Sequence, residues 1–135
     1  MLAIWFELCL RHRIDEVLLN LHAHADQVRS FLECHDYKVK VTVSLEPTLL
    51  GSAGTLAANR AWLGQDSQFW IFYADVLTNI DLDRMMSAHL RSGMIATLGL
   101  YRVPNPTQCG IVQVDENGVI REFHEKPTAT DSIIS

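Results

Sequence analysis

The sequence has few of the features that mark secreted, membrane-spanning or nucleic-acid-binding proteins. Its 3 cysteines are far apart and form no CxxC pair, which argues against a disulfide framework and favours a reducing compartment. No apolar run approaches the roughly 18 to 20 residues that a membrane-spanning helix needs. The formal net charge is −5, whereas a non-specific nucleic-acid binder usually carries a basic face. We therefore expect a cytoplasmic protein whose partners are neither membranes nor nucleic acids.

Common catalytic and metal-binding motifs are also absent. The chain contains no P-loop, no GxGxxG sequence and no GxSxG nucleophile elbow. Its histidines do not follow zinc-ligand spacing, so we predict no metal site among them and interpret His12 as a surface or helix-face residue. The stretch that includes Asp75, Asp81 and Asp83 has the acidic composition of an EF-hand loop, but Ile80 stands where that loop needs glycine.

The chain does have enough apolar residues for a folded domain. Hydrophobic residues make up 48% of its 135 residues and charged residues 20%, a composition that argues against wholesale disorder. No linker or internal repeat divides the sequence, so we predict a single domain over residues 1–135.

Hydrophobic periodicity predicts that helices and strands alternate along most of the chain. This alternation implies the α/β class, with a Rossmann-like, mostly parallel sheet and helices on both faces. An Asn-Gly sequence at 117–118 adds a C-terminal β-hairpin. Helices are predicted at 2–13, 25–33, 55–63 and after Asp81, and strands at 16–21, 38–44, 68–74, 94–101, 111–114 and 119–123.

Ligands of open α/β sheets bind at the carboxyl ends of the strands, and three sequence positions are predicted to lie there. The first is the small-residue segment 50–55, where Gly51 and Gly54 would allow the backbone to approach a ligand beside a helix N-terminus. An ordinary tight loop explains the same residues, and spacing alone favours that interpretation.

The other two positions carry charged side chains. Asp75 directly follows the predicted strand 68–74, where a carboxylate can hold Mg²⁺, and a turn-forming aspartate is an equally good interpretation. Glu125 and Lys126 end the last predicted strand. This pair could bind a sugar hydroxyl and a phosphate, although a solvated charge pair before Pro127 is the commoner case.

The order of these motifs resembles that of the sugar-phosphate nucleotidyltransferases. The resemblance extends over essentially the whole chain and is strongest to enzymes of the mannose-1-phosphate guanylyltransferase type, followed by glucose-1-phosphate nucleotidyltransferases. One departure is Arg13, where the family usually has glycine. The matching stretches are EP and LGSAGTL within 46–56, FYADVLT at 72–78, CGIV at 109–112 and FHEKP at 123–127.

The resemblance implies a reaction in which a sugar 1-phosphate attacks the α-phosphate of an NTP and yields an NDP-sugar, such as GDP-mannose, and pyrophosphate. It also implies Mg²⁺ as the cofactor, with Asp75 as its catalytic ligand and Lys126 as the catalytic contact to the sugar phosphate. The remaining residues implied by the resemblance are Glu46, Gly51 and Gly54 for the nucleotide, and Gly110, Glu125 and Lys126 for the sugar.

Two features of the family are not found in this sequence. Family members begin with a strand and a glycine-rich loop that grips the triphosphate, and they place a second metal-binding aspartate beyond the Glu-Lys-Pro strand. We therefore expect an interior fragment of a nucleotidyltransferase domain that does not complete the reaction alone. The alternative is a non-catalytic regulatory or sugar-nucleotide-binding module derived from the same family. An uncovered strand edge would also allow chains to pair as a homo-oligomer.

Overall fold

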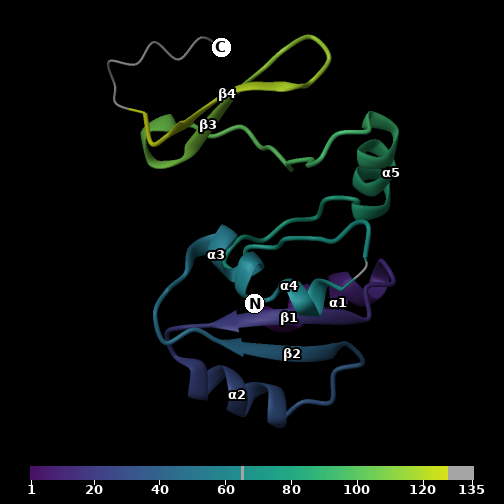
Figure 1. Ribbon diagram of the computed structural model, residues 1–135, viewed down its shortest axis with the longest axis vertical. Coiled ribbons are helices and arrows are strands. Elements are labelled where there is room, and N and C mark those ends of the chain that lie inside the picture. The colour runs from purple at the N-terminus through teal and green to yellow at the C-terminus, as the bar shows by residue number, and fades with distance from the viewer. Residues whose placement is uncertain (65, 128–135) are drawn as a thin grey trace. The chain divides into compact units, whose positions relative to one another are not determined.

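The computed structural model describes residues 1–64 and 66–127. Contacts between residues divide the chain into two compact units, Met1–Arg91 and Ser92–Ser135, whose elements are drawn in Figure 1. Among the described residues, no helix has both the length and the apolar character needed to cross a lipid bilayer.

The first unit contains a pair of parallel strands, β1 (Glu16–Leu21) and β2 (Lys40–Leu45), in which Val17 lies opposite Val41. The helix α2 (Ala25–Glu33) connects the two strands, so this part of the chain is a βαβ unit (Figure 1). The apolar run of β1 and the alternating valines of β2 are the patterns that predicted these strands, and both predictions are confirmed.

Helices cover both faces of this strand pair. On one face, Val41 packs in a cluster with Phe6 of α1 (Leu2–Arg11). Thr42 points to the opposite face, because successive strand residues alternate, and its Oγ1 accepts a hydrogen bond of 3.2 Å from the indole Nε1 of Trp62. The predicted α/β class, with helices on both faces, is therefore confirmed.

Two residues after the end of α1, Arg13 adopts the left-handed conformation, with a φ of +59°. The N–H of Arg13 donates to the carbonyl of Leu10 at 3.1 Å, and the N–H of Ile14 donates to the carbonyl of Cys9 at 2.8 Å. This pair of hydrogen bonds is a Schellman motif. Glycine is favoured at this position because it reaches positive φ without steric cost, which explains the glycine usual in the family that the sequence resembles.

Residues 51–54 form the first turn of a helix, so the prediction of a loop before residue 55 is wrong. The helix α3 extends over Gly51–Ala58, and α4 (Arg60–Leu63) follows a break at Asn59. The composition indicated a loop because glycine is a poor helix former, but this local preference is weak enough for tertiary contacts to override it.

The segment 68–74, predicted as a central strand, is not a strand in the structure. Its side chains alternate as they would in one, since Trp70 and Phe72 pack against the α1 core whereas Ile71 and Tyr73 are 52% and 60% exposed. A strand also needs a ladder of hydrogen bonds to a neighbouring backbone, and within the described part of the chain this segment has no such neighbour. The predicted strand 94–101 is absent from the described sheets for the same reason.

The helix α5 (Leu82–Ser92) begins where the sequence predicted. The Oδ1 atom of Asp81 accepts a hydrogen bond of 2.9 Å from the N–H of Arg84, which is the expected role of an N-cap residue. Leu82, the first residue of the helix, is only 2% exposed and packs with Trp5 of α1. The start of α5 is thereby anchored to the core of the first unit.

The second unit contains the predicted hairpin. The strand β3 (Gly110–Val114) pairs antiparallel with β4 (Ile120–Glu125), and a short 3₁₀ helix, η1 (Pro106–Gln108), precedes them. In the turn, the N–H of Gly118 donates to the carbonyl of Asp115 at 2.9 Å. The φ of Gly118 is +76°, a conformation that the Asn-Gly sequence favours.

Candidate functional site

Glu46 connects the end of β2 to the beginning of α3. It is the residue directly after β2 and is only 2% exposed. Its carboxylate accepts hydrogen bonds from the hydroxyl of Thr55 and, at 3.3 Å, from the N–H of Leu50. The carbonyl of Glu46 also lies 2.7 Å from Nδ1 of His22. A buried acceptor at this place satisfies a backbone donor that the start of a helix leaves without an intrahelical partner.

These contacts favour the ionised form of Glu46. The hydroxyl of Thr55 contributes most to lowering the pKa of Glu46, and the N–H of Leu50, the side chain of Asn20 and the charge of His22 lower it further, while burial acts in the opposite direction. Hydrogen bonds to a carboxylate stabilise its charged form. Glu46 therefore acts as a positioning group for the first turn of α3, and its contact with a nucleotide stays a prediction.

The two glycines of this segment are required for different reasons. Gly51 has a φ of +71°, which favours glycine, and a Cβ there would meet nothing within 4 Å. A Cβ on Gly54 would lie 2.9 Å from the Cβ of Leu50, which is too close for an unstrained contact. Between the glycines, the Ser52 hydroxyl lies 2.8 Å from the Tyr73 hydroxyl, so the first turn of α3 is connected to the segment that leads to Asp75.

Asp75 lies in an exposed turn after the segment 68–74. The N–H of Val76 donates to the carbonyl of Tyr73 at 3.0 Å, and no hydrogen bond or ion pair is formed by the Asp75 carboxylate to another described residue. Its oxygen atoms are therefore available to a cation. Mg²⁺ keeps several waters and commonly takes only one or two protein carboxylates together with substrate phosphates, so the single carboxylate of Asp75 fits this ion.

In the second unit, Gly110 and Glu125 are partners across the hairpin. A Cβ on Gly110 would lie 2.7 Å from Cζ of Phe123 and 3.2 Å from Oε2 of Glu125. Glycine is required here because the phenyl ring and the carboxylate fill the space above its backbone. Two of the three residues predicted to bind a sugar, Gly110 and Glu125, are thus adjacent in the structure.

Lys126 follows β4 in an unusual backbone conformation. Its φ is +46°, a region that typically costs a residue with a Cβ about 1–2 kcal/mol. Its N–H donates to the carbonyl of Cys109 at 3.2 Å, and its Nζ lies 4.0 Å from Oε1 of Glu125, with both side chains more than half exposed. Strained residues of this kind are concentrated at functional sites, which supports the sequence prediction without testing it.

The structure assembles the predicted residues into two groups, one in each unit. Sequence reasoning missed the polar side chains that support the first group, namely Thr55, Ser52 and Tyr73. Their hydroxyl groups lie within the recognised motifs, but the residues they contact are distant in the sequence. Thr55 contacts Glu46, 9 residues away, and Ser52 contacts Tyr73, 21 residues away. The first group contains Glu46, Gly51 and Gly54, and the second contains Gly110, Glu125 and Lys126. Asp75 lies in the first unit, two residues after Tyr73, whose hydroxyl contacts Ser52.

Comparison with known proteins identifies the family. The sequence profile of the nucleotidyl transferase family matches residues 1–135. The chain belongs to this family. Its relatives include sugar-phosphate nucleotidyltransferases, as the order of the motifs predicted.

Three relatives illustrate the similarity. Mannose-1-phosphate guanylyltransferase 1 of Arabidopsis thaliana is 32% identical over 119 residues, which cover 84% of this chain and 33% of the relative. The mannose-1-phosphate guanylyltransferase catalytic subunit beta of Drosophila melanogaster is 31% identical over 115 residues, which cover 83% and 31%. The UTP–glucose-1-phosphate uridylyltransferase of a Synechocystis strain is 29% identical over 140 residues, which cover 94% and 36%. The chain therefore spans about one third of the length of these relatives.

Proposed function

We propose that this nucleotidyltransferase chain takes part in the transfer of a nucleotidyl group from an NTP to a sugar 1-phosphate, with an NDP-sugar and pyrophosphate as products. The names of the relatives favour mannose 1-phosphate and GTP, and hence GDP-mannose, as the substrates and product. The observation that carries the proposal is the end of the hairpin, where Gly110, Glu125 and Lys126 are adjacent.

The hairpin end offers the groups that a sugar 1-phosphate needs. The carboxylate of Glu125, whose side chain is more than half exposed, can accept hydrogen bonds from sugar hydroxyls. The ammonium of Lys126 can pair with the phosphate as a compact charge. Holding the sugar at two points orients the attacking oxygen, and orientation is the larger part of what a protein contributes to this class of reaction.

The first unit offers the groups that an NTP needs. The first turn of α3, held by Glu46, presents backbone N–H groups. Asp75 would hold Mg²⁺, which supplies charge neutralisation on the phosphates when bound. Both features agree with an anionic, phosphate-bearing ligand.

The first experiment measures binding by the chain itself. We expect GDP-mannose to bind with higher affinity than UDP-glucose or dTDP-glucose in isothermal titration, and binding to strengthen when Mg²⁺ is added. The variant Glu125→Gln should weaken binding of the sugar nucleotide more than binding of GDP. If the chain binds the sugar nucleotide but its residues contribute nothing to turnover in a complete enzyme, the result would instead favour a non-catalytic sugar-nucleotide-binding module.

The second experiment concerns catalysis in a complete enzyme that contains this sequence. Asp75→Asn should remove most of the Mg²⁺-dependent turnover, because an amide is a much poorer ligand for the ion than a carboxylate. Asp66→Asn, in an exposed residue that follows α4, is the matched control and should leave turnover unchanged. Turnover close to wild type in the Asp75→Asn enzyme would contradict the assignment.

A further inference from the structure

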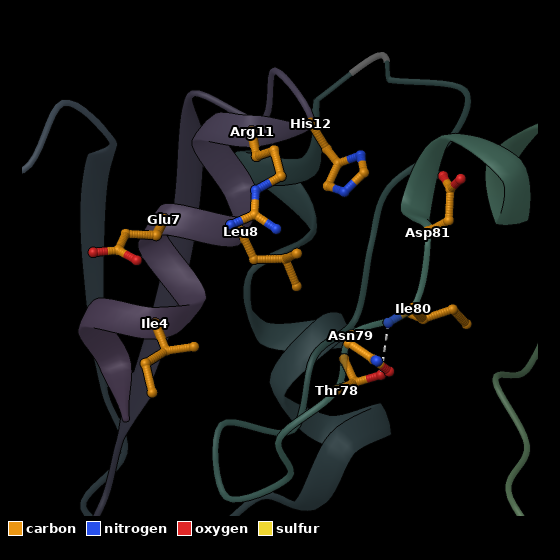
Figure 2. A pocket seen from close by; sticks show the side chains of 9 residues that line it. All are labelled: Ile4, Glu7, Leu8, Arg11, His12, Thr78, Asn79, Ile80 and Asp81. Atoms are coloured by element: carbon orange, nitrogen blue, oxygen red, sulfur yellow. Dashed lines mark hydrogen bonds between the residues drawn. The ribbon is translucent and has the colours of Figure 1, made fainter.

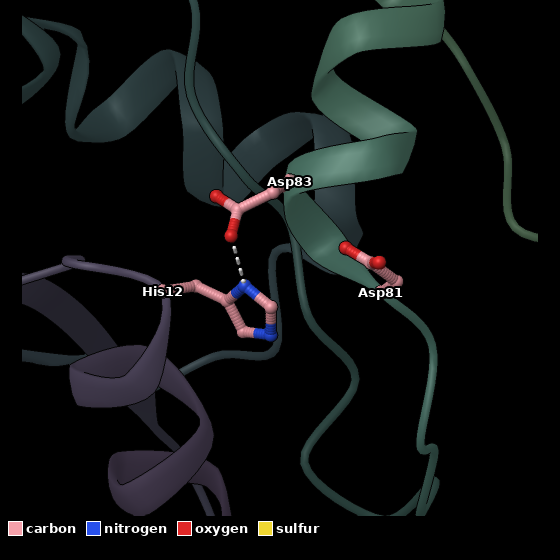
Figure 3. A group of neighbouring side chains, drawn as sticks. All are labelled: His12, Asp81 and Asp83. Atoms are coloured by element: carbon pink, nitrogen blue, oxygen red, sulfur yellow. Dashed lines mark hydrogen bonds and ion pairs between the residues drawn. The ribbon is translucent and has the colours of Figure 1, made fainter.

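A histidine and two aspartates that are far apart in the sequence meet in the first unit. His12 is the residue after α1, and Asp81 and Asp83 stand at the beginning of α5. The Nδ1 atom of His12 lies 3.0 Å from Oδ2 of Asp83, and one ligand atom from each of the three residues lies within 4.8 Å of the others. Figure 3 shows both carboxylates on the side of α5 that faces the imidazole.

We propose that His12, Asp81 and Asp83 form a binding site for a divalent transition-metal cation, with Zn²⁺ as the best-suited ion. The proposal goes beyond nucleotidyl transfer and involves none of the residues assigned to it. One imidazole and two carboxylates suit Zn²⁺, Co²⁺ or Ni²⁺, whereas Mg²⁺ and Ca²⁺ prefer oxygen ligands alone. The two carboxylates also balance the charge of a divalent ion.

The distances are close to those that the ion requires. Bonds from Zn²⁺ to nitrogen and oxygen are about 2.0–2.2 Å long, so neighbouring ligands of a tetrahedral ion are about 3.4 Å apart. The 3.0 Å between Nδ1 of His12 and Oδ2 of Asp83 is a few tenths of an ångström shorter than this, so a small outward movement of the Asp83 carboxylate would admit the ion. The cation would take the place of the proton between these two atoms, and a neutral imidazole bound through Nδ1 carries its proton on Nε2. Asp83 has a side chain that is 60% exposed, so it can adjust while the imidazole stays in place.

His12 and Asp81 are held in place, and each keeps an atom that can bind the ion. The side chain of His12 is only 12% exposed, which limits the positions of its ring. The Oδ1 atom of Asp81 accepts the N-cap hydrogen bond from Arg84, and its Oδ2 atom has no partner among residues 1–64 and 66–127. The N-terminus of α5 carries roughly half a positive charge, which is small compared with the two negative charges that face the ion.

A pocket beside these residues leaves room for the remaining ligands of the ion. It has a volume of about 310 Å³, and His12 and Asp81 both line it. Figure 2 shows these two side chains in the upper part of the pocket, with Asn79 and Thr78 below them. Water or a polar ligand can therefore complete the coordination. Arg11 also lines this pocket, so the affinity must come from direct bonds and not from a broadly negative surface.

The test is a titration of the 135-residue chain with Co²⁺, followed by its visible absorption, and with Zn²⁺, followed by calorimetry. We expect saturable binding of one ion per chain. Asp83→Asn and His12→Gln should each lower the affinity at least about tenfold, the smallest loss usually seen when a metal site is damaged. Bound Zn²⁺ should also raise the unfolding midpoint of the wild-type chain but not of Asp83→Asn.

The hairpin provides a matched control. Nε2 of His124 lies 2.9 Å from Oε2 of Glu122, and this pair has no third ligand among the described residues. His124→Gln should therefore leave the affinity unchanged. The proposal is overturned if no saturable binding occurs, if Asp83→Asn binds like the wild type, or if His124→Gln causes an equal loss. Asp83→Asn is nearly isosteric, so it decides the test even if His12→Gln does not fold.

Discussion

Replacing Arg13 with glycine should stabilise the chain. Arg13 has a φ of +59° at the end of α1 and is exposed. A residue with a Cβ pays about 1–2 kcal/mol in this left-handed conformation, while glycine loses roughly 0.5–1 kcal/mol more backbone entropy on folding. The net gain expected for Arg13→Gly is therefore about 0.5–1 kcal/mol in the free energy of unfolding.

The gain can be measured by urea denaturation followed through tryptophan fluorescence. Trp5 lies in α1, buried and stacked on Phe72 at a centroid distance of 4.6 Å, so its emission reports on the packing of this helix. With a slope of about 1.5 kcal/mol per molar urea, the midpoint should rise by roughly 0.3–0.7 M. The Schellman hydrogen bonds are made by backbone groups, so glycine keeps them.

Two control variants separate the backbone effect from the loss of a charge. Arg13→Ala removes the same charge but keeps a Cβ, so it should give none of the gain. Gly93, the residue after α5, has a φ of +63° and open space around a Cβ, so Gly93→Ala should destabilise by about 1 kcal/mol. An Arg13→Gly chain that is no more stable than Arg13→Ala would refute the reasoning.

Three further predictions concern the two groups of site residues and the hairpin turn. The folded-state pKa of Glu46 is lowered, so its stabilising effect is present above its unfolded pKa and disappears as the pH falls through the folded value. Glu46→Gln should therefore reduce stability at pH 7 and flatten the dependence on pH below the ordinary pKa of glutamate, as measured by urea midpoints. Gly110→Ala should weaken sugar-nucleotide binding at least about tenfold because its Cβ would displace Phe123 and Glu125, and calorimetry that finds unchanged affinity would contradict this. The pKa of Asp115 is lowered mainly by the hydrogen bond from the N–H of Val119, and further by Arg121 and the N–H of Asn117. Nuclear magnetic resonance should therefore show the hairpin turn loosening only as the pH falls below the ordinary pKa of aspartate. The variant Asp115→Asn should show no such change over that pH range.

The elements that were predicted correctly are those set by local patterns. The strand β1 and the helix α2 begin and end where hydrophobic periodicity placed them, and the hairpin turns at its Asn-Gly sequence. Periodicity works for these elements because one face of each is buried, and the spacing of apolar residues records which face it is.

The errors occurred where a distant contact decides the outcome. The segment 51–54 is helical although its glycines favour a loop, and the Glu46 carboxylate that holds it comes from the end of β2. The segment 68–74 has the residues and the alternating burial of a strand, but a strand also depends on the backbone of a neighbour. Neither effect can be seen in a window of a few residues.

The candidate site shows the same division. Sequence motifs predicted roles for Glu46, Asp75 and Lys126, because their residue types and order are typical of the nucleotidyltransferase family, and these roles stay predictions. The structure added the atoms that hold them, such as the Thr55 hydroxyl on Glu46 and the positive φ of Lys126. These features depend on the path of the backbone, so the motifs alone could not predict them.

The sequence by itself therefore determined the α/β class, the family and the residues expected to carry its chemistry. Only the tertiary structure decided where Gly110 must lack a side chain and how His12 meets Asp83 across 71 positions of the chain. The physical reason is that residue spacing encodes which side of an element is buried, whereas contacts between elements arise only when those buried sides pack together.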